Sequence, residues 1–367
     1  MFTEKGHSAQ NEHDTDTTNT PEAGNKQADE ALQPALKKSG IEAVHDCEPG
    51  IKRKRAGKGF YYINPDGSKL TDTEMLAHIK TLRIPPAYAD VWICNNTNGH
   101  LLATGIDAKK RKQYIYHPEF TAKNNKSKFR RLRKFGMALP ALRKKLSQDL
   151  KAAEWTLQKT TALVVKLIDE FQIRVGNRAY EKLNGSYGIT TLRKKHLRRD
   201  GDNLSFEFKA KSGKMWKVPV NNKELASQLS DISTVPGLQL FKFTGADGKQ
   251  HGLSSGHVNS YIREATGSKF SAKDFRTWKA SVLAIEKAPE AEQLSEGKRL
   301  PQKINALLRL VAAEMGNTMS VCRKYYIHPA VLSAFEKGKL AKCLQKVSGE
   351  RLRFFRKAEL AAMELMK

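Results

Sequence analysis

The pattern of apolar and polar positions changes along the chain, from short strand-like runs to long helical periods. Strands are predicted over residues 60–63, 91–94, 101–104 and 112–117, and the turn Asn64-Pro65-Asp66-Gly67 closes the first of them. Thr71 and Glu74 have the spacing of a capping box, which predicts a short helix that ends before Pro85-Pro86. Residues 51–125 are therefore expected to form a small, strand-rich domain.

From about Lys126 the apolar residues recur at helical spacing. An amphipathic helix is predicted over residues 151–172, and further helices at about 255–265, 272–285, 302–315, 329–337 and from about 349. Residues 204–208 and 214–220 flank the turn Lys211-Ser212-Gly213 as a hairpin, and residues 238–243 are a candidate third strand. The sequence thus predicts an α+β fold, in which residues 126–367 form a mostly α-helical domain with a small antiparallel sheet.

Charge separates the start of the chain from the rest. The whole chain has 65 Lys and Arg against 38 Asp and Glu, yet residues 1–50 carry a net charge of −6 and the remainder +33. Residues 1–50 are polar, acidic and poor in aromatics, so they are expected to form a disordered tail. The basic remainder favours a polyanionic partner, most simply nucleic acid. The acidic tail either competes with DNA for the basic surface or has no role.

Several kinds of chemistry lack their motifs. No Gly-Lys pair is followed by Ser or Thr with a glycine five residues earlier, so a phosphate-binding loop for ATP is not expected. No acidic cluster suits a two-metal nuclease, and Cys47, Cys94, Cys322 and Cys343 form no metal-binding pair. The chain has no long apolar run and no signal peptide, so a cytoplasmic protein is expected.

Three basic blocks are candidates for DNA contact. In the first, the run Lys109–Lys112 precedes Tyr114 and Tyr116, which share one face of the predicted strand while Gln113 faces the other way. The alternative is that both tyrosines pack a core. The other two blocks are a predicted hinge between the domains and a run before the hairpin, namely Lys123, Lys126, Lys128, Arg130, Arg131, Arg133 and Lys134, and Arg193, Lys194, Lys195, Arg198 and Arg199. Either block could instead be a solvated charged surface.

A set of cations and tyrosines marks the candidate chemistry. It comprises Arg174 directly after the long helix, Lys214 at the hairpin, Lys273 and Arg276 in Lys-Asp-Phe-Arg, and Gly316-Asn317-Thr318 with Tyr326 nine residues beyond Asn317. Each residue has an ordinary structural explanation when taken singly. Arg174 could cap a helix, Arg276 could pair with an acidic neighbour, and Tyr326 could be a core tyrosine.

Taken together, in this order and spacing, these residues resemble the catalytic domain shared by type IB DNA topoisomerases and tyrosine recombinases. The resemblance covers roughly residues 58–345 and is strongest to the poxvirus-like and small bacterial topoisomerases. In the first domain, Ile84-Pro85-Pro86, Asp90-Val91-Trp92-Ile93 and Lys112-Gln113-Tyr114-x-Tyr116 look like the DNA clamp of that branch. Lys273 stands where recombinases usually have histidine, which favours the topoisomerases.

The resemblance implies a role for each residue. Arg174 and Arg276 would hold the scissile phosphate, Lys214 would protonate the leaving 5′ oxygen, and Tyr326 would be the nucleophile, with the adjacent Tyr325 as the alternative. Asn317 replaces the histidine of many members and would donate a neutral hydrogen bond. The expected DNA contacts are Lys112, Gln113, Tyr114, Tyr116, Arg130, Arg131, Tyr180 and Lys273.

The expected enzyme is a monomer that clamps double-stranded DNA at the bacterial nucleoid and needs neither metal nor cofactor. It would relax supercoils through a 3′-phosphotyrosyl intermediate, because the phosphotyrosine keeps the energy of the broken bond for resealing. Two other functions stay open. A tyrosine recombinase would use the same chemistry on two sites, and a basic DNA- or RNA-binding module would use none.

Overall fold

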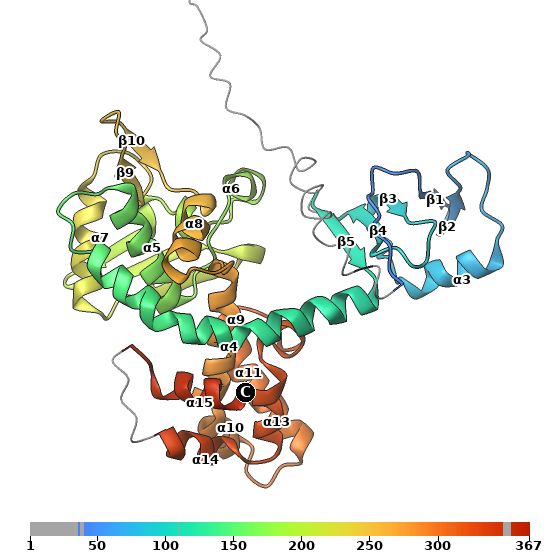
Figure 1. Ribbon diagram of the computed structural model, residues 1–367. Coiled ribbons are helices and arrows are strands. Elements are labelled where there is room, and N and C mark those ends of the chain that lie inside the picture. Colours follow the sequence, from blue (N-terminus) through green and yellow to red (C-terminus); the bar gives the residue numbers. More distant parts are fainter. Residues whose placement is uncertain (1–35, 37–39, 109, 348–353) are drawn as a thin grey trace, which may run out of the picture. The chain divides into compact units, whose positions relative to one another are not determined.

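The structure is a computed structural model that describes residue 36 and residues 40–108, 110–347 and 354–367. It divides into two compact units, Met1–Lys126 and Ser127–Lys367. The fold class is α+β, as the sequence predicts, with strands dominating the first unit and helices the second (Figure 1).

The first unit is built on an antiparallel sheet of five strands in the order β2-β1-β3-β4-β5. The strands are β1 (Ile51–Ala56), β2 (Gly59–Ile63), β3 (Ala89–Ile93), β4 (Leu101–Ile106) and β5 (Lys112–Tyr116). The four predicted strands are confirmed. β1 was not predicted as a strand, because the basic run after Ile51 has no apolar alternation. Arg53 of β1 is held by donating hydrogen bonds to the carbonyls of Pro85 and Tyr88.

Helix α3 (Thr73–Thr81) covers this sheet, and its start differs from the predicted capping box. The N-cap is Asp72, whose carboxylate accepts hydrogen bonds from the backbone N–H groups of Glu74 and Met75 at 2.8 and 3.3 Å. The capping box predicted at Thr71 is therefore wrong by one residue. An aspartate carboxylate caps at least as well as a threonine hydroxyl and adds a negative charge at the helix N-terminus.

Residues 41–50, assigned to the acidic tail by composition, pack against the sheet. Ile41 and Val44 are buried, and Glu42 forms a β-bridge with Gly99. The indole of Trp92 donates a hydrogen bond to the carbonyl of Glu48 at 2.9 Å. The packed chain thus begins ahead of the expected boundary at residue 51, and residues 1–35 and 37–39 of the expected tail lie outside the described residues.

The long helix α4 (Pro118–Asp149) carries the second basic block. The block was expected to lie in a hinge between the domains, whereas the structure places it within one continuous helix. Its apolar residues explain this, since Phe129, Leu132, Phe135 and Leu139 recur every three or four residues and are all buried.

The second unit is mainly helical. Its other helices are α5 (Leu157–Phe171), α6 (Arg178–Asn184), α7 (Lys223–Thr234), α8 (Ser255–Thr266), α9 (Ala272–Glu286), α10 (Ala288–Leu294), α11 (Leu300–Met315), α12 (Met319–Val321), α13 (Pro329–Glu336), α14 (Leu340–Lys346) and α15 (Lys357–Leu365). The helices predicted near 255, 272, 302 and 329 are confirmed. α5 begins later than predicted because Thr156 caps it. The helix predicted from about 349 corresponds to α15, and residues 348–353 lie outside the described part.

The sheet of the second unit has three strands in the order β6-β7-β8: Leu197–Asp200, Asn203–Lys209 and Met215–Pro219. The predicted hairpin is β7 and β8, but its third strand is β6. Residues 238–243 do not join this sheet, because Leu240 and Phe241 turn into the core and the chain then forms β9 (Lys242–Thr244), which pairs with β10 (Gln250–Gly252).

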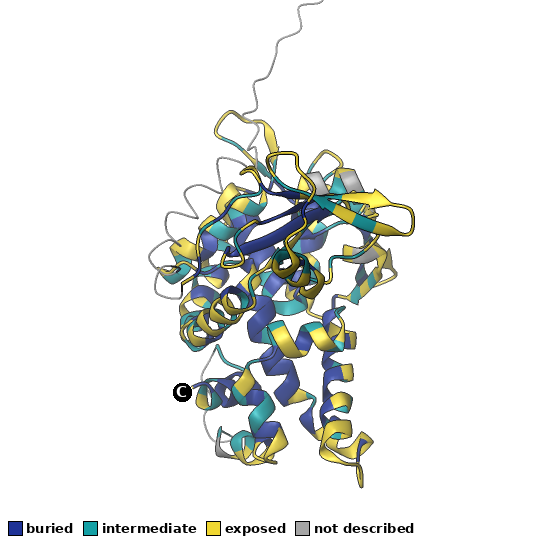
Figure 2. Ribbon diagram, turned by 90° about the vertical axis from the view of Figure 1, so that its right-hand side faces the viewer, coloured by how far each residue is buried: buried dark blue, intermediate teal, exposed yellow. Residues whose placement is uncertain are grey.

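Helix α9 lies in the core of the second unit, where it crosses α4 in the view of Figure 1 and packs against α11 and α15. Most of its residues are buried, and buried positions are dark blue in Figure 2. Gly136 of α4 lets the two helices approach, because a Cβ at this position would lie 2.4 Å from the Trp278 ring of α9. The buried carboxylate of Glu359 in α15 accepts hydrogen bonds from Trp278 and from Arg143 of α4. These contacts join α9 to α4 and α15, and α9 carries Arg276. No helix among the described residues is long and apolar enough to cross a membrane.

Candidate active site

The backbone around Arg174 is fixed by a close approach of two glycines. Gly176 has a φ of +89°, and a Cβ on Gly188 would lie 2.4 Å from the Gly176 Cα and 2.6 Å from the Arg174 carbonyl oxygen. The N–H of Ile189 donates to that carbonyl at 2.8 Å, and the N–H of Thr190 donates to the carbonyl of Val175 at 2.9 Å. The segment after α5 therefore presents the Arg174 side chain from a defined position.

Arg276 is almost completely buried on α9, with an exposed fraction of 5%. Its Nη1 donates to the carbonyl of Gln172 at 2.7 Å and its Nη2 to the carbonyl of Met315 at 3.0 Å. Both carbonyls lie at helix C-termini, which carry partial negative charge. The guanidinium is thus held by the ends of α5 and α11, while its Nε has no partner among the described residues.

Asn317 follows α11, whose C-cap Gly316 has a left-handed φ of 60°. Its Oδ1 accepts a hydrogen bond from Nη2 of Arg174 at 2.9 Å, which orients the amide. Its Nδ2 is buried and finds no acceptor within the described part of the chain. A buried amide donor without a partner is costly, so this N–H group suits an acceptor that the protein itself does not supply.

Tyr326 ends a π-helical turn, Cys322–Tyr326, that follows α12. The Arg276 Cζ lies 5.6 Å from the centroid of its ring. The adjacent Tyr325 has different neighbours, since its ring lies 5.3 Å from Nζ of Lys324 and 5.9 Å from Nζ of Lys128. Of the two tyrosines, Tyr326 is the one beside the buried arginine.

The two guanidiniums raise the electrostatic energy of this cluster. Burial, and then the charge of Arg276, lower the pKa of Arg174 to about 10, and burial also lowers the pKa of Arg276. Tyr326 acts in the opposite direction on both groups. Neither arginine contacts a carboxylate among the described residues. Like charges held together without a counterion favour the binding of an anion between them.

The structure does not bring Lys214 into contact with the other four predicted catalytic residues. Lys214 is exposed and ends the turn Lys211–Gly213, where its carbonyl accepts a hydrogen bond from the N–H of Ala210 at 2.8 Å. It lines a cavity together with Gln172 and Gly316, the sequence neighbours of the site. Lys211 is exposed on the same turn and is a second candidate for the same position.

The DNA-facing candidates of the first unit lie on β5. Tyr114 and Tyr116 are exposed on one face, as the strand period predicts, with ring centroids 6.1 Å apart and planes within 11°. Gln113 faces the other way and donates to the carboxylate of Asp107 at 2.9 Å. Lys112 forms an ion pair with Asp46 at 2.5 Å. The two tyrosines therefore do not pack a core.

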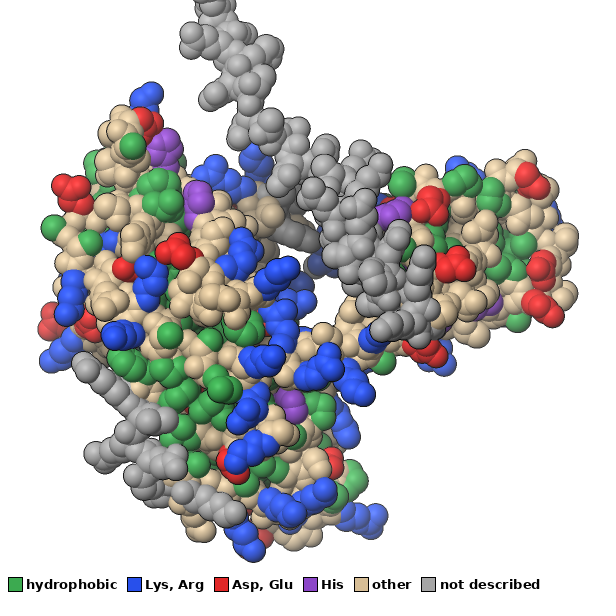
Figure 3. Space-filling view, viewed as in Figure 1, with side chains coloured by type: hydrophobic (Ala, Val, Ile, Leu, Met, Phe, Trp, Pro, Cys, Tyr) green, Lys and Arg blue, Asp and Glu red, His purple; other side chains and the backbone are tan. Residues whose placement is uncertain are grey.

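The candidate DNA contacts of the second unit differ in side-chain exposure and in whether the side chain already has an ion-pair partner. Arg130 and Lys273 are exposed, whereas Arg131 pairs with Asp274 at 2.9 Å and donates to the Lys269 carbonyl at 2.8 Å. The side chain of Tyr180 lies outside the described part of the structure. Lys and Arg side chains gather along α4 on the face shown in Figure 3. Lys128 belongs to this group, but its spacing in the sequence gives no sign of its contact with Tyr325.

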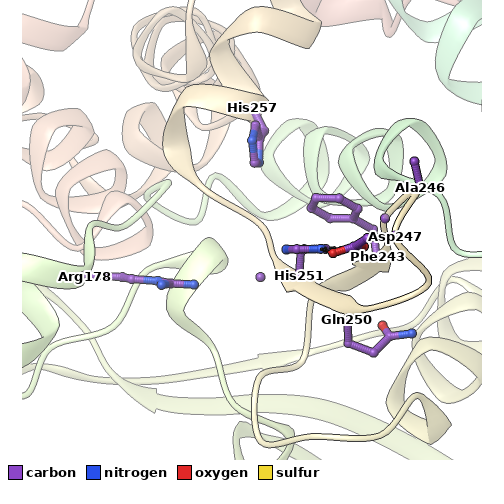
Figure 4. A pocket seen from close by; sticks show the side chains of 9 residues that line it. Arg178, Phe243, Ala246, Asp247, Gln250, His251 and His257 are labelled. Carbon is purple, nitrogen blue, oxygen red and sulfur yellow. Dashed lines mark hydrogen bonds and ion pairs between the residues drawn. The ribbon is translucent and has the colours of Figure 1, made fainter. Parts of the chain in front are cut away.

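A separate cavity lies beside the β9–β10 hairpin (Figure 4). His251 stacks on Phe243 and bonds to the carboxylate of Asp247 at 3.0 Å, while Arg178 and His257 approach from α6 and α8. This cavity includes none of the predicted catalytic residues. Within the described part of the chain, no group of three His, Cys, Asp or Glu side chains is placed to hold a metal ion.

Known proteins resemble the chain over most of its length. Residues 109–350 match the family model described as the catalytic core of eukaryotic DNA topoisomerase I, and residues 59–107 match the N-terminal domain of bacterial DNA topoisomerase IB. DNA topoisomerase 1B of Acanthamoeba polyphaga mimivirus is 29% identical over 78% of this chain and 88% of its own length. DNA topoisomerase 1B of vaccinia virus (strain Copenhagen) is 22% identical over 74% of this chain and 84% of its own.

Proposed function

The chain belongs to the type IB DNA topoisomerase family, and we therefore propose that it relaxes supercoiled DNA by cutting and resealing one strand through Tyr326. The observation that carries this proposal is the convergence of Arg174, Arg276, Asn317 and Tyr326 on one site. These residues are distant in sequence. Arg174 follows the end of α5, Asn317 follows the end of α11, and Tyr326 ends the π-helical turn. Arg276 lies on α9. Among the described residues, the two arginines contact no carboxylate and the Asn317 amide donor finds no acceptor.

In the proposed cleavage step, the phenol oxygen of Tyr326 attacks the phosphorus of a backbone phosphodiester. A tyrosyl–phosphorus bond forms, the bond from phosphorus to the 5′ oxygen breaks, and the 3′ end stays on the protein. The phenol releases its proton to solvent water, and a lysine on the 211–214 turn, Lys214 in our assignment, supplies a proton to the leaving 5′ oxygen and is reprotonated from solvent. Resealing is the reverse reaction, in which the 5′ hydroxyl attacks and the phenolate leaves.

The phosphate gains negative charge in the transition state, and the site supplies positive charge in advance. Guanidiniums are planar cations with several donors, which suits the nonbridging oxygens of the phosphate. The unpartnered Nδ2 of Asn317 adds a neutral donor to the same oxygens. In our proposal Asn317 therefore contacts the phosphate without adding a third cation. The proposed reaction needs neither a metal ion nor ATP.

Between the two steps the free DNA end must rotate while the protein keeps hold of the duplex. We propose that Lys112, Tyr114, Tyr116, Arg130 and Lys273 contact DNA mainly through phosphates and sugars, as a monomeric clamp. Binding should then weaken steeply with salt, because each phosphate contact releases counterions. Such a protein would act on the bacterial nucleoid.

The proposal is tested with negatively supercoiled plasmid in EDTA and without ATP. The wild-type protein should relax the plasmid and, when denatured during the reaction, remain attached to the 3′ ends of nicked DNA. Tyr326→Phe should abolish both results while DNA binding survives, and the matched Tyr325→Phe variant should keep them. Loss of attachment in Tyr325→Phe alone would move the nucleophile by one residue. A wild-type protein that binds but never relaxes DNA would leave only a binding function.

A further inference from the structure

Two successive residues of α4 contact the segment that carries Tyr326. Nζ of Lys128 donates a hydrogen bond to the backbone carbonyl of Tyr325. The ring of Phe129 packs edge-on against the ring of His328, with centroids 5.4 Å apart. The contacts fall one residue before Tyr326 and two residues after it, so α4 holds both sides of the nucleophile.

Helix α9 also contacts the segment that carries Tyr326. Ser281 accepts a hydrogen bond from the N–H of His328 at 2.9 Å, and its hydroxyl lies 3.5 Å from the carbonyl of Tyr326. The segment itself is a π-helical turn, a rare conformation that occurs mostly as single turns and often at functional sites. The contacts from α4 and α9 support this turn from outside, and the Lys128 ammonium supplies the charged donor.

The surroundings of Lys128 disfavour the charged form of its side chain. It is half-buried next to Lys273, and burial together with this like charge lowers its pKa to about 8, while Asp274 acts in the opposite direction. The same Asp274 is already engaged by Arg131. A lysine kept where its charge is disfavoured indicates a role other than stabilising the fold.

We propose that Lys128 is a positioning residue for the nucleophile: it fixes the Tyr325 carbonyl and thereby orients the Tyr326 phenol toward the phosphate held by Arg174 and Arg276. Lys128 acts through the backbone and does not itself touch the reacting atoms. This inference rests on the proposed function, because it concerns the orientation of the same tyrosine. It assigns to one lysine of the basic α4 block a role distinct from DNA binding.

The test compares Lys128→Met with Lys128→Arg, which keeps a cationic donor. Single-turnover cleavage is measured at saturating DNA, together with DNA affinity and melting temperature. Lys128→Met should cleave on the order of 10-fold more slowly or worse, which corresponds to the loss of a charged hydrogen bond. Its affinity should change by less than about threefold and its melting temperature should not fall. Lys128→Arg should recover most of the rate.

The control is Lys144→Met, which removes the same charge from an exposed position on the same helix, away from the site. It should cleave like the wild type. Equal cleavage rates for Lys128→Met and the wild type would overturn the proposal. So would a loss confined to DNA affinity, which would make Lys128 a phosphate contact, or a rate loss matched by a fall in melting temperature. Failure of the wild-type protein to cleave would instead overturn the proposed function.

Discussion

Asp46 and Lys112 form an ion pair at 2.5 Å between the segment before β1 and strand β5. Lys112 is half-exposed beside the stacked Tyr114 and Tyr116, which makes it a candidate phosphate contact. The Asp46 carboxylate therefore pairs with the ammonium group that a DNA phosphate would contact. If acidic residues near the N-terminus compete with DNA for the basic surface, Asp46 is a specific candidate for this role.

We predict that Asp46→Asn binds duplex DNA more tightly than the wild type, by up to about fivefold at low salt, the range expected for a partly exposed ion pair. Fluorescence anisotropy with a short duplex would measure this change. Glu48→Gln is the control, because it removes the same charge from a nearby carboxylate that bonds to the His45 backbone instead. Weaker binding by Asp46→Asn would show that Asp46 positions Lys112 for DNA and does not compete with it.

Gly188 is expected to control catalysis through the backbone of Arg174. A Cβ at Gly188 would lie 2.4 Å from backbone atoms of Gly176 and 2.6 Å from the Arg174 carbonyl oxygen. The backbone segment that carries Arg174 would therefore have to shift. We predict that Gly188→Ala slows cleavage by about 100-fold, since misplacing one charged donor costs roughly that much. Gly256→Ala is the matched control, because the nearest atom to its added Cβ is at 3.5 Å.

Single-turnover cleavage of both glycine variants at saturating DNA would measure these effects, with melting temperature recorded alongside. A Gly188→Ala protein that cleaves at the wild-type rate would show that the contact between the two glycines has no influence on the position of Arg174.

The candidate general acid can be assigned by changing the leaving group. Lys211 and Lys214 are both exposed on one turn, and neither contacts the Arg174 cluster in the structure. We predict that Lys214→Ala slows cleavage of normal DNA but cleaves at nearly the wild-type rate when sulfur replaces the 5′ leaving oxygen. A thiol has a pKa of about 8.5, so it leaves without needing a proton.

Lys211→Ala is measured in parallel on both substrates. If only Lys211→Ala shows the rescue, the general acid lies three residues earlier on the same turn. If neither variant is slowed on normal DNA, the turn supplies no proton and the acid must lie elsewhere.

The sequence predicted best those features that depend on local spacing. The strands around Tyr62 and Trp92 and the helix that carries Arg276 follow from short apolar patterns, and the motifs around Arg174, Asn317 and Tyr326 each stand at the end of such an element. β6 was missed because Leu197 is its only apolar residue. That strand forms because it pairs along its whole length with β7 across the two-residue turn Gly201-Asp202, in which Gly201 has a left-handed φ of 57°.

The hydrogen bonds around the candidate site join residues that are far apart in the chain. Arg276 bonds to carbonyls 104 and 39 residues away, and Lys128 reaches a carbonyl 197 residues away. Backbone carbonyls carry no sequence signature, since every residue has one. This is why the residue types of the site were predictable from motifs, while the role of Lys128 required the structure.

His196 should make the protein lose stability in mild acid. It is buried at 7% exposure, its ring lies 4.3 Å from that of Tyr187, and its Nδ1 accepts a hydrogen bond from the N–H of Arg193 at 3.0 Å. Burial, and then the charges of Lys195 and Arg193, lower its pKa to about 4. In the unfolded chain an ordinary histidine takes up its proton near pH 6.5.

Between pH 6.5 and about 4 the unfolded state therefore binds one more proton than the folded state at this residue, so the free energy of unfolding falls as the pH falls. We predict that His196 accounts for about 1–3 kcal/mol of this loss, at roughly 1.4 kcal/mol per pKa unit.

Urea unfolding at pH 7, 6, 5 and 4.5 would measure this loss. The His196→Asn variant, which can keep the Arg193 hydrogen bond but does not titrate, should show a shallower dependence of the free energy of unfolding on pH. His78, His257 and His328 also have lowered pKa values and contribute to the slope of both proteins, so the difference between the two curves isolates His196. Parallel curves for the two proteins would mean that the acid sensitivity comes from other groups, namely those histidines and carboxylates with lowered pKa values such as Glu359.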